Sequence, residues 1–421
     1  MKRSPLIVIF TTVFIDLVGF GIVIPVLPFY AEGTVFNATP RTVGLLFASY
    51  SVMQLIFSPI LGRLSDRYGR RPVLLISIIG TGIGFLILGF AKFLWMLFVG
   101  RILDGITGGN ISTAQAYIAD ITTKENRAKG MGMIGAAFGL GFIFGPAIGG
   151  ILSRWGIHVP FFFAAALCFA NAVLLFFTLP ETVTPDHPAR TSAAGGRSLG
   201  QVIQALQTPR LAFVLVIYFF FIVAFSIMTT SFSLYTMFRF GYDAQHNGYL
   251  FAYVGFISVI VQGGLIGRLV KKFGELPLVI VGAFCFAISL FAVPFVGPLT
   301  GGLAGLLIGG GVFSLGNSLA TPALTSLASK SVGPAEQGTV LGVTQSVASL
   351  ARAVGPFLAA VLIDSAIPHR GADGVSHFMS DHSLFVTFWT ASAIMLIAFI
   401  LASYFLRAYA GQYRQAEVAE A

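Results

Sequence analysis

The sequence has few charged residues. Only 10% of its 421 residues are Asp, Glu, Lys or Arg, whereas 56% are hydrophobic. A soluble globular domain carries about 25% charged residues, so the soluble class is excluded. A membrane-spanning helix needs about 20 apolar residues, and the chain has room for about twelve such helices. The composition therefore predicts an all-α polytopic membrane protein.

Cysteine is also scarce, and the familiar catalytic patterns are missing. Cys168 and Cys285 both lie in apolar runs, where a thiol is expected to act as a small core side chain. The sequence contains no Walker loop with its lysine, no HxxxH pair and no Ser/His/Asp pattern. We therefore expect no ATP drive, no enzymatic activity, no metal site and no cofactor.

What the sequence does contain is a repeat. Residues 62–72 read GRLSDRYGRRP, and residues 267–277 read GRLVKKFGELP. The offset from 62 to 267 is 205 residues, close to half of the chain. Each copy is a short charged loop between two long apolar segments. Two similar membrane halves are typical of secondary transporters, whose site lies at the interface between the halves.

The apolar runs give the expected order of helices. They predict spans near 6–30, 42–62, 73–91, 94–118, 129–152, 159–179, 211–238, 246–267, 277–295, 300–328, 337–365 and 383–407. The first run is long and holds Asp16, so we expect a membrane helix there and not a cleavable signal peptide. The sequence predicts two pseudo-symmetric six-helix bundles, at residues 1–180 and 211–407. A linker at 181–210 joins them, and an unstructured tail follows at 408–421.

The basic residues alternate from loop to loop. The net charge of +9 would also suit a nucleic-acid-binding protein. Most of the 25 Lys and Arg residues, however, lie on the side of the N-terminus, as the positive-inside rule requires. We therefore expect no nucleic acid partner, and we expect both termini, the linker and the tail to be cytoplasmic.

Three stretches of sequence resemble a known family. The loop at 62–72 resembles the motif between helices 2 and 3 of the major facilitator superfamily. Residues 141–150, GFIFGPAIGG, resemble the helix 5 motif of its proton-driven antiporters, and residues 16–28 resemble helix 1 of its tetracycline and multidrug exporters. Arg101 and Gly105 match part of the helix 4 motif. The resemblance covers the whole chain, most strongly residues 10–180.

The resemblance implies a twelve-helix transporter, monomeric, in the cytoplasmic (inner) membrane of a bacterium. Three positions depart from the tetracycline exporters. Gly84 stands where they carry an acid in helix 3, Ser258 where they carry a histidine in helix 8, and Phe286 where they carry an acid in helix 9. These differences argue against tetracycline itself and leave a related efflux role open.

The resemblance also implies two mechanical motifs. Asp66 is expected to act as a latch that holds the halves together on the inner side of the outward-open state, pairing with a guanidinium and with a helix N-terminus. Asp120, Glu125 and Arg127 extend this network, and the second copy, with Lys271 in place of Asp66, is expected to be a weaker latch. The alternative is a topology signal with solvated charges. The latch residues are Gly62, Asp66, Arg67, Gly69, Arg70 and Arg71. The antiporter motif residues, expected to form a tight helix contact, are Gly141, Gly145, Pro146, Gly149 and Gly150.

Ionisable residues inside the membrane are candidates for proton coupling. Asp16, Arg101, Asp104 and Arg352 are predicted to lie there. Arg101 and Asp104 are three residues apart and share a helix face. Asp16 has no cation near it in sequence, so we expect it to be the freer proton carrier. The alternative is structural pairing, of Asp104 with Arg101 and of Asp16 with Arg352.

Polar side chains on the same helix faces predict a substrate cavity. The alternative is ordinary helix packing. The candidate cavity residues are Ser112, Gln115, Thr229, Phe232, Tyr235, Asn317 and Gln345. Together these features predict a proton-coupled exporter of amphipathic drug-like small molecules. The alternatives are export of a natural metabolite, such as a sugar or lipid-like compound, and a non-transporting sensor.

Overall fold

The computed structural model is almost wholly helical and describes residues 5–33, 35–122, 124–183, 209–332, 337–365 and 367–420. Its helices are α1 (Pro5–Glu32), α2 (Pro40–Tyr68), α3 (Arg70–Gly89), α4 (Leu94–Thr107), α5 (Asn110–Ile121), α6 (Lys124–Ser153), α7 (Val159–Thr178), α9 (Pro209–Phe240), α10 (Ala244–Ile260), η1 (Val261–Leu265), α11 (Ile266–Phe273), α12 (Glu275–Ala292), η2 (Val293–Phe295), α13 (Gly302–Lys330), α14 (Gln337–Leu362) and α15 (Asp381–Glu420). Two short strands, β1 (His369–Arg370) and β2 (Ser376–His377), form an antiparallel hairpin.

Twelve segments span the fold, which confirms the predicted helix count. Within the described ranges, eleven helical segments are long and apolar enough to cross a membrane. The twelfth is α4 followed by α5, each too short alone because the helix breaks at Gly108 and Gly109. Large apolar side chains such as Ile76, Phe177 and Ile308 are exposed on the surface of the bundle, as lipid contact requires.

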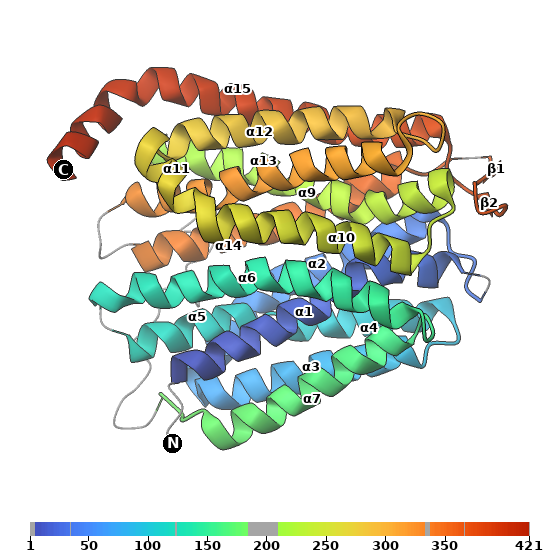
Figure 1. The fold of residues 1–421 in the computed structure, drawn as a ribbon. Coiled ribbons are helices and arrows are strands. Elements are labelled where there is room, and N and C mark those ends of the chain that lie inside the picture. The colour runs from blue at the N-terminus through green and yellow to red at the C-terminus, as the bar shows by residue number, and fades with distance from the viewer. Residues whose placement is uncertain are drawn as a thin grey trace.

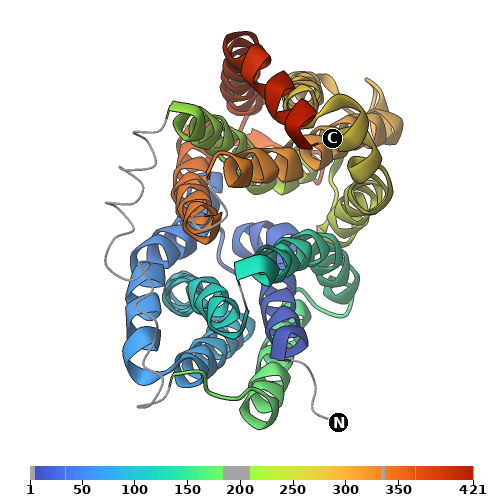
Figure 2. The same ribbon diagram turned by 90° about the vertical axis from the view of Figure 1, so that its left-hand side faces the viewer.

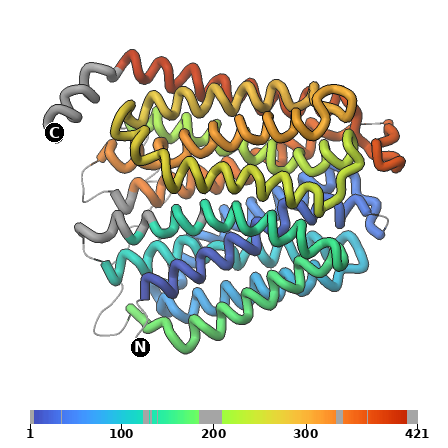
Figure 3. The backbone as a smooth tube through the Cα atoms, viewed as in Figure 1, coloured from blue at the N-terminus to red at the C-terminus, as the bar shows by residue number. Residues whose placement is uncertain are grey.

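The helices form two bundles, α1–α7 and α9–α15 (Figure 1). The view along the helices shows the two bundles side by side (Figure 2). We call the end where α1 begins the terminal end. The opposite end carries the β1–β2 hairpin, and we call it the hairpin end (Figure 3).

The two bundles meet mainly through two helix pairs, α2 with α14 and α6 with α10, and α1 adds smaller contacts with α9 and α10. Both contacts are tightest near the hairpin end. A Cβ on Gly44 would lie 2.5 Å from the Cβ of Ala360, and one on Gly150 would lie 2.3 Å from the Cα of Gly248. Only glycine permits backbones to approach so closely.

The internal repeat is visible in the packing. The loops that follow α2 and α11 both turn at a glycine with positive φ, Gly69 at 102° and Gly274 at 76°. Gly145 of α6 packs on Gly21 of α1, and Gly355 of α14 packs on Ser226 of α9. The second half therefore repeats the first at the level of individual helix contacts.

The structure of the tail differs from the predicted one. The sequence predicts an unstructured segment after Arg407, whereas α15 continues to Glu420. Apolar residues give way to polar helix-forming residues at this point, so the hydropathy pattern ends while the helix does not. Residues 184–208 of the predicted linker lie outside the described residues.

Candidate functional site

A cluster of buried charges lies inside the first bundle. Asp16 of α1 accepts a hydrogen bond of 3.0 Å from the Asn110 side-chain amide, and Arg101 donates to Asp104 at 2.7 Å. Asp16 is 9% exposed, Asp104 3% and Arg101 0%. Buried charges in a low-dielectric interior must be paired or hydrogen-bonded. Of these two carboxylates, Asp104 has a cationic partner and Asp16 a neutral one.

The break between α4 and α5 creates this arrangement. Gly108 and Gly109 interrupt the helix, and the Gln54 side-chain amide donates to the Gly108 carbonyl at 2.9 Å. A Cβ on Gly109 would lie 2.8 Å from the Cα of Ser58, so α5 rests directly on α2. The new helix begins at Asn110, whose side chain reaches Asp16.

The glycine motif of α6 holds the other side of Asp16. Cβ atoms on Gly141, Gly145 and Gly149 would lie within 3.0 Å of α1, against Leu17, Gly21 and Ile22 in turn. Four-residue spacing puts these glycines on one helix face. Their neighbour is α1 of the same bundle, which positions the segment that carries Asp16.

Tyr50 of α2 connects this cluster with the second bundle. Its ring lies under the Arg101 guanidinium, 4.2 Å from the centroid, and its hydroxyl accepts from Gln54 at 2.9 Å. Because α2 also packs on α14, Tyr50 lies on the helix that joins the charge cluster to the second bundle.

A cavity of about 270 Å³ lies between the two bundles. Its lining comes from both halves and includes Ile134 and Leu341, near the terminal-end starts of α6 and α14. Six of the predicted site residues line it. These are Gln115, Pro146, Thr229, Asn317, Gln345 and Arg352.

Three predicted cavity residues lie elsewhere among the described side chains. Tyr235 is fully buried and donates its hydroxyl to the Val293 carbonyl at 2.9 Å. Phe232 packs against the Phe251 ring, with centroids 5.6 Å apart. Ser112 donates to the Ser58 carbonyl at 3.0 Å. These residues satisfy helix contacts, which a polar stripe in the sequence does not distinguish from a cavity wall.

A row of aromatic rings runs across the interface between the halves. Phe142 of α6 and Phe225 of α9 meet edge to face at 5.8 Å, and Phe225 stacks on Phe313 of α13 at 6.0 Å. All three line the cavity. They provide apolar ring surface in a cavity that also has amide side chains in its lining.

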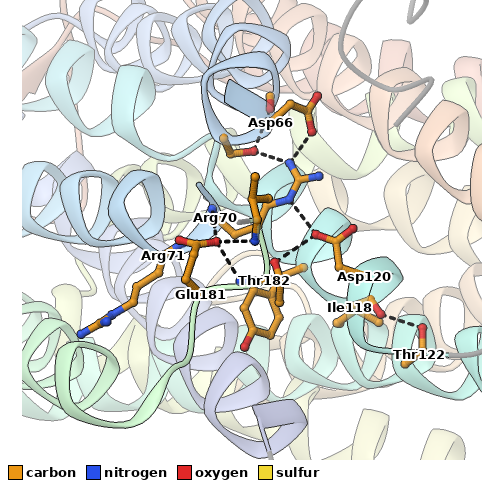
Figure 4. Close-up of polar contacts among 12 residues, drawn as sticks. Asp66, Arg70, Arg71, Ile118, Asp120, Thr122, Glu181 and Thr182 are labelled. Carbon is orange, nitrogen blue, oxygen red and sulfur yellow. Dashed lines mark hydrogen bonds and ion pairs between the residues drawn. The ribbon is translucent and has the colours of Figure 1, made fainter. Parts of the chain in front are cut away.

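The charged loop at residues 62–72 forms a network within its own half (Figure 4). The fully buried Arg70 guanidinium pairs with Asp66 at 2.5 Å and with Asp120 of α5 at 3.0 Å. Arg67 is exposed and lies over the Tyr68 ring. In this conformation Asp66 pairs inside the first bundle, so its contact with the second bundle remains a prediction. The side chains of Glu125 and Arg127 lie outside the described residues.

Glu181 is a partner that the sequence reasoning missed. Its carboxylate accepts the backbone N–H groups of Arg70 at 2.9 Å and of Arg71 at 3.0 Å (Figure 4). A carboxylate at a helix N-terminus satisfies free donors and the positive end of the helix dipole. The start of the segment between the halves is therefore tied to the loop.

The second copy of the loop also holds an ion pair. Glu275, at the first position of α12, lies 2.8 Å from the Lys330 ammonium at the end of α13 and accepts from Ser326 at 3.0 Å. Lys271 is exposed.

An ionic contact joins the halves at the hairpin end. His377 of β2 lies 2.8 Å from Glu32 of α1 through Nδ1 and 2.8 Å from Asp373 through Nε2. Burial opposes protonation of His377, but the hydrogen bonds and charges of Glu32 and Asp373 outweigh it and raise the pKa of the imidazole above its usual range. The carboxylates lie on opposite ring nitrogens, and among the described residues no group of three His, Cys, Asp or Glu is placed to hold a metal ion.

Asn110, Tyr50 and His377 were also missed by sequence reasoning. Asn110 reaches Asp16 only because the helix breaks at Gly108 and Gly109, so the polar stripe of Arg101 and Asp104 did not predict it. Tyr50 and His377 gave no signal, because their partners lie far away in sequence or in the other half.

The chain matches known transporters over most of its length. The model of the Major Facilitator Superfamily matches residues 9–356. The class B tetracycline resistance protein of Escherichia coli is 35% identical over 84% of this chain and 87% of its own. Multidrug resistance protein 2 of Bacillus subtilis (strain 168) is 32% identical over 86% of this chain and 90% of its own.

Solved structures show the same fold. The human organic anion transporter MFSD10 (TETRAN) superimposes with a TM-score of 0.68 at 24% identity, covering 95% of this chain and 99% of its own. At this identity the likeness concerns the fold alone. The family match and the relatives establish that this chain is a membrane transporter, not an enzyme, and that it belongs to the major facilitator superfamily.

Proposed function

We propose that this protein is a proton-coupled exporter of amphipathic drug-like small molecules that works by alternating access. The observation that carries the proposal is a cavity between two bundles, with aromatic and polar walls, next to two buried carboxylates. Relatives named for tetracycline and multidrug resistance support it. We propose a monomer in a bacterial inner membrane, with the terminal end facing the cytoplasm.

With that orientation, the conformation described here is inward-facing. The bundles touch at the hairpin end, and the cavity lining extends toward the terminal end as far as Ile134 and Leu341. Substrate enters the cavity from the cytoplasm or inner leaflet. The bundles then rock about the α2–α14 and α6–α10 contacts, the hairpin end opens, and the substrate leaves.

Asp16 is the proposed proton carrier. Its partner Asn110 is a neutral amide, so Asp16 can gain and lose a proton without breaking an ion pair. Asp104 has to separate from Arg101 before it can do the same. One proton entering across about 100 mV contributes about 2.3 kcal/mol, and a pH difference of one unit adds about 1.4 kcal/mol. One or two protons therefore suffice for a useful gradient.

Export of a natural metabolite is the second candidate. The amide side chains of Gln115, Asn317 and Gln345 in the cavity would suit the hydroxyl groups of a sugar-like compound. A growth-inhibition panel in an efflux-deficient host separates the two candidates. Protection against aromatic drugs supports the first, and no protection against any compound argues for the second.

The coupling proposal is tested in inverted vesicles that contain the full-length transporter. We expect Asp16→Asn to abolish pH-driven uptake of a drug identified in the panel while leaving its binding measurable. Asp104→Asn leaves Arg101 unpaired in a dry interior and is expected to disturb binding or folding more. Uphill uptake by Asp16→Asn on a pH gradient would show that the proton moves elsewhere.

Orientation is tested with single cysteines at Ser192, in the segment between the halves, and at Ala372, in the hairpin. An impermeant thiol reagent added outside whole cells should label position 372 and spare position 192. The reverse pattern would overturn the proposed topology.

A further inference from the structure

The formal charge in the lining of the cavity is positive only. Among its described lining residues, Arg352 alone carries a formal charge, and no carboxylate lines the cavity. Asp16 and Asp104 hold their partners inside the first bundle, behind the lining. A molecule in the cavity therefore meets neutral polar groups, aromatic rings and one guanidinium.

Arg352 is directed at this space. It lies in the middle of α14, yet its side chain is only half-buried, and it lines the cavity. Its Nη2 donates to Ser349 of the same helix at 3.2 Å. Tyr218 lines the cavity too. A guanidinium is the side chain best shaped to hold a carboxylate or sulfonate.

An aromatic wall lines the same cavity as this guanidinium. One turn after Arg352, Gly355 lets α14 touch α9, where a Cβ would lie 2.4 Å from the Cβ of Ser226. Phe225 is the neighbouring residue on α9, and it stacks on Phe313. One face of the cavity therefore offers ring surface, and the adjacent helix offers a fixed positive charge.

We propose that Arg352 forms the binding subsite for an anionic group of an aromatic substrate, so that the transporter selects aromatic anions over cations of the same shape. The inference rests on the proposed export function and names its substrate class. The anionic group lies on Arg352 and the ring system against Phe225 and Phe313.

The test uses a matched pair of xanthene dyes, fluorescein as the anion and rhodamine 123 as the cation. Binding is measured by equilibrium dialysis with the purified full-length transporter, without any gradient. We expect the wild type to bind fluorescein at least tenfold more tightly than rhodamine 123. Arg352→Gln should remove most of this preference, Arg352→Lys should keep part of it, and Lys92→Gln, which removes an exposed cation outside the cavity, should leave it unchanged.

A second variant keeps the test valid if Arg352→Gln does not fold. Asn317→Asp adds a negative charge to the cavity wall without changing its shape, and it should weaken fluorescein binding and strengthen rhodamine 123 binding. Equal binding of the two dyes, tighter binding of rhodamine 123, or binding of neither would overturn the proposal. Because no gradient is present, anion selectivity without pH-driven uptake would reject the export function alone.

Discussion

The two halves share a backbone plan at the terminal end, but the residues that form the ion pair there have exchanged their charges. In the first half Arg70 pairs with Asp66 and Asp120. An offset of 205 residues carries Arg70 to Glu275 and Asp66 to Lys271, and the offset of 210 that relates Gly145 to Gly355 carries Asp120 to Lys330. All three positions have inverted their charge, and the pair between the loop and the neighbouring helix remains, as Glu275 with Lys330.

Two structural features are common to both copies of the repeat. The glycine turn and an ion pair between loop and helix survive in both halves, whereas the signs of the paired charges are exchanged. The second copy is therefore not simply a weakened first copy. The two ion pairs differ in burial, because Arg70 is fully buried while the Lys330 side chain is 54% exposed. We infer that the first corner stabilises its bundle more than the second.

Removing Arg70 should give the largest effect. Arg70→Gln leaves Asp66 and Asp120 facing each other without a cation, and breaking a buried ion pair costs about 3 kcal/mol or more. We expect a large loss of folded transporter, measured as the monodisperse fraction in gel filtration of a fluorescent fusion. Arg67→Gln removes an exposed charge from the same loop and serves as the control. Equal yields of the two variants would contradict the ranking.

Asp66→Asn should have the next largest effect, and on turnover more than on folding. The change preserves shape and removes the charge proposed to latch the halves in the outward-open state. We expect a folded protein with impaired transport and fewer outward-open molecules, measured by spin-label distances across the terminal end. Normal transport in proteoliposomes with unchanged distances would reject the latch.

Changes in the second corner should be milder. Glu275→Gln breaks a pair whose lysine is largely solvated, and such pairs contribute about 0–1 kcal/mol. The double variant Glu275→Lys with Lys330→Glu gives this corner the polarity of the first and should restore most of the small loss in thermal stability. If Glu275→Gln lost as much stability as Arg70→Gln, the inference that the first corner stabilises its bundle more than the second would be wrong.

The smallest effect concerns the hairpin end, where an ion pair joins the halves instead of stabilising one of them. His377 has a raised pKa, so its attraction to Glu32 is fully present below about pH 6.5 and is lost as the pH rises through the raised value. Closure of the hairpin end should therefore weaken as external pH rises. Spin-label distances between α1 and the hairpin should lengthen with pH in the wild type, whereas His377→Gln should show no such response over this range.

Much of the fold was predictable because apolar runs report membrane spans directly. All twelve predicted spans have a helical counterpart. The predicted loop at 62–72 was wrong in extent, because α2 runs to Tyr68 and α3 begins at Arg70, so only Gly69 is not helical. The pair of Arg101 and Asp104 was also predictable, since three-residue spacing is a local property of a helix.

The remainder depended on contacts between distant segments. The Glu275–Lys330 pair becomes visible in the sequence only when both repeat offsets are applied together. Tyr235 was assigned to the cavity because a polar stripe looks the same whether it faces a neighbouring helix or a cavity. The helix break that brings Asn110 to Asp16 depends on two adjacent glycines, whose effect on direction a hydropathy pattern does not record.

The contact between Gly150 and Gly248 has a genetic consequence. Every missense change in a glycine codon adds at least a Cβ, and a Cβ on either residue would lie within 2.4 Å of the other's Cα. Neither position can vary alone, and enlarging both at once makes the clash worse. A random mutagenesis screen for lost resistance should therefore recover substitutions at these two codons as readily as in the cavity, although neither residue lines it. The close distance between the halves at this point therefore requires glycine at both positions.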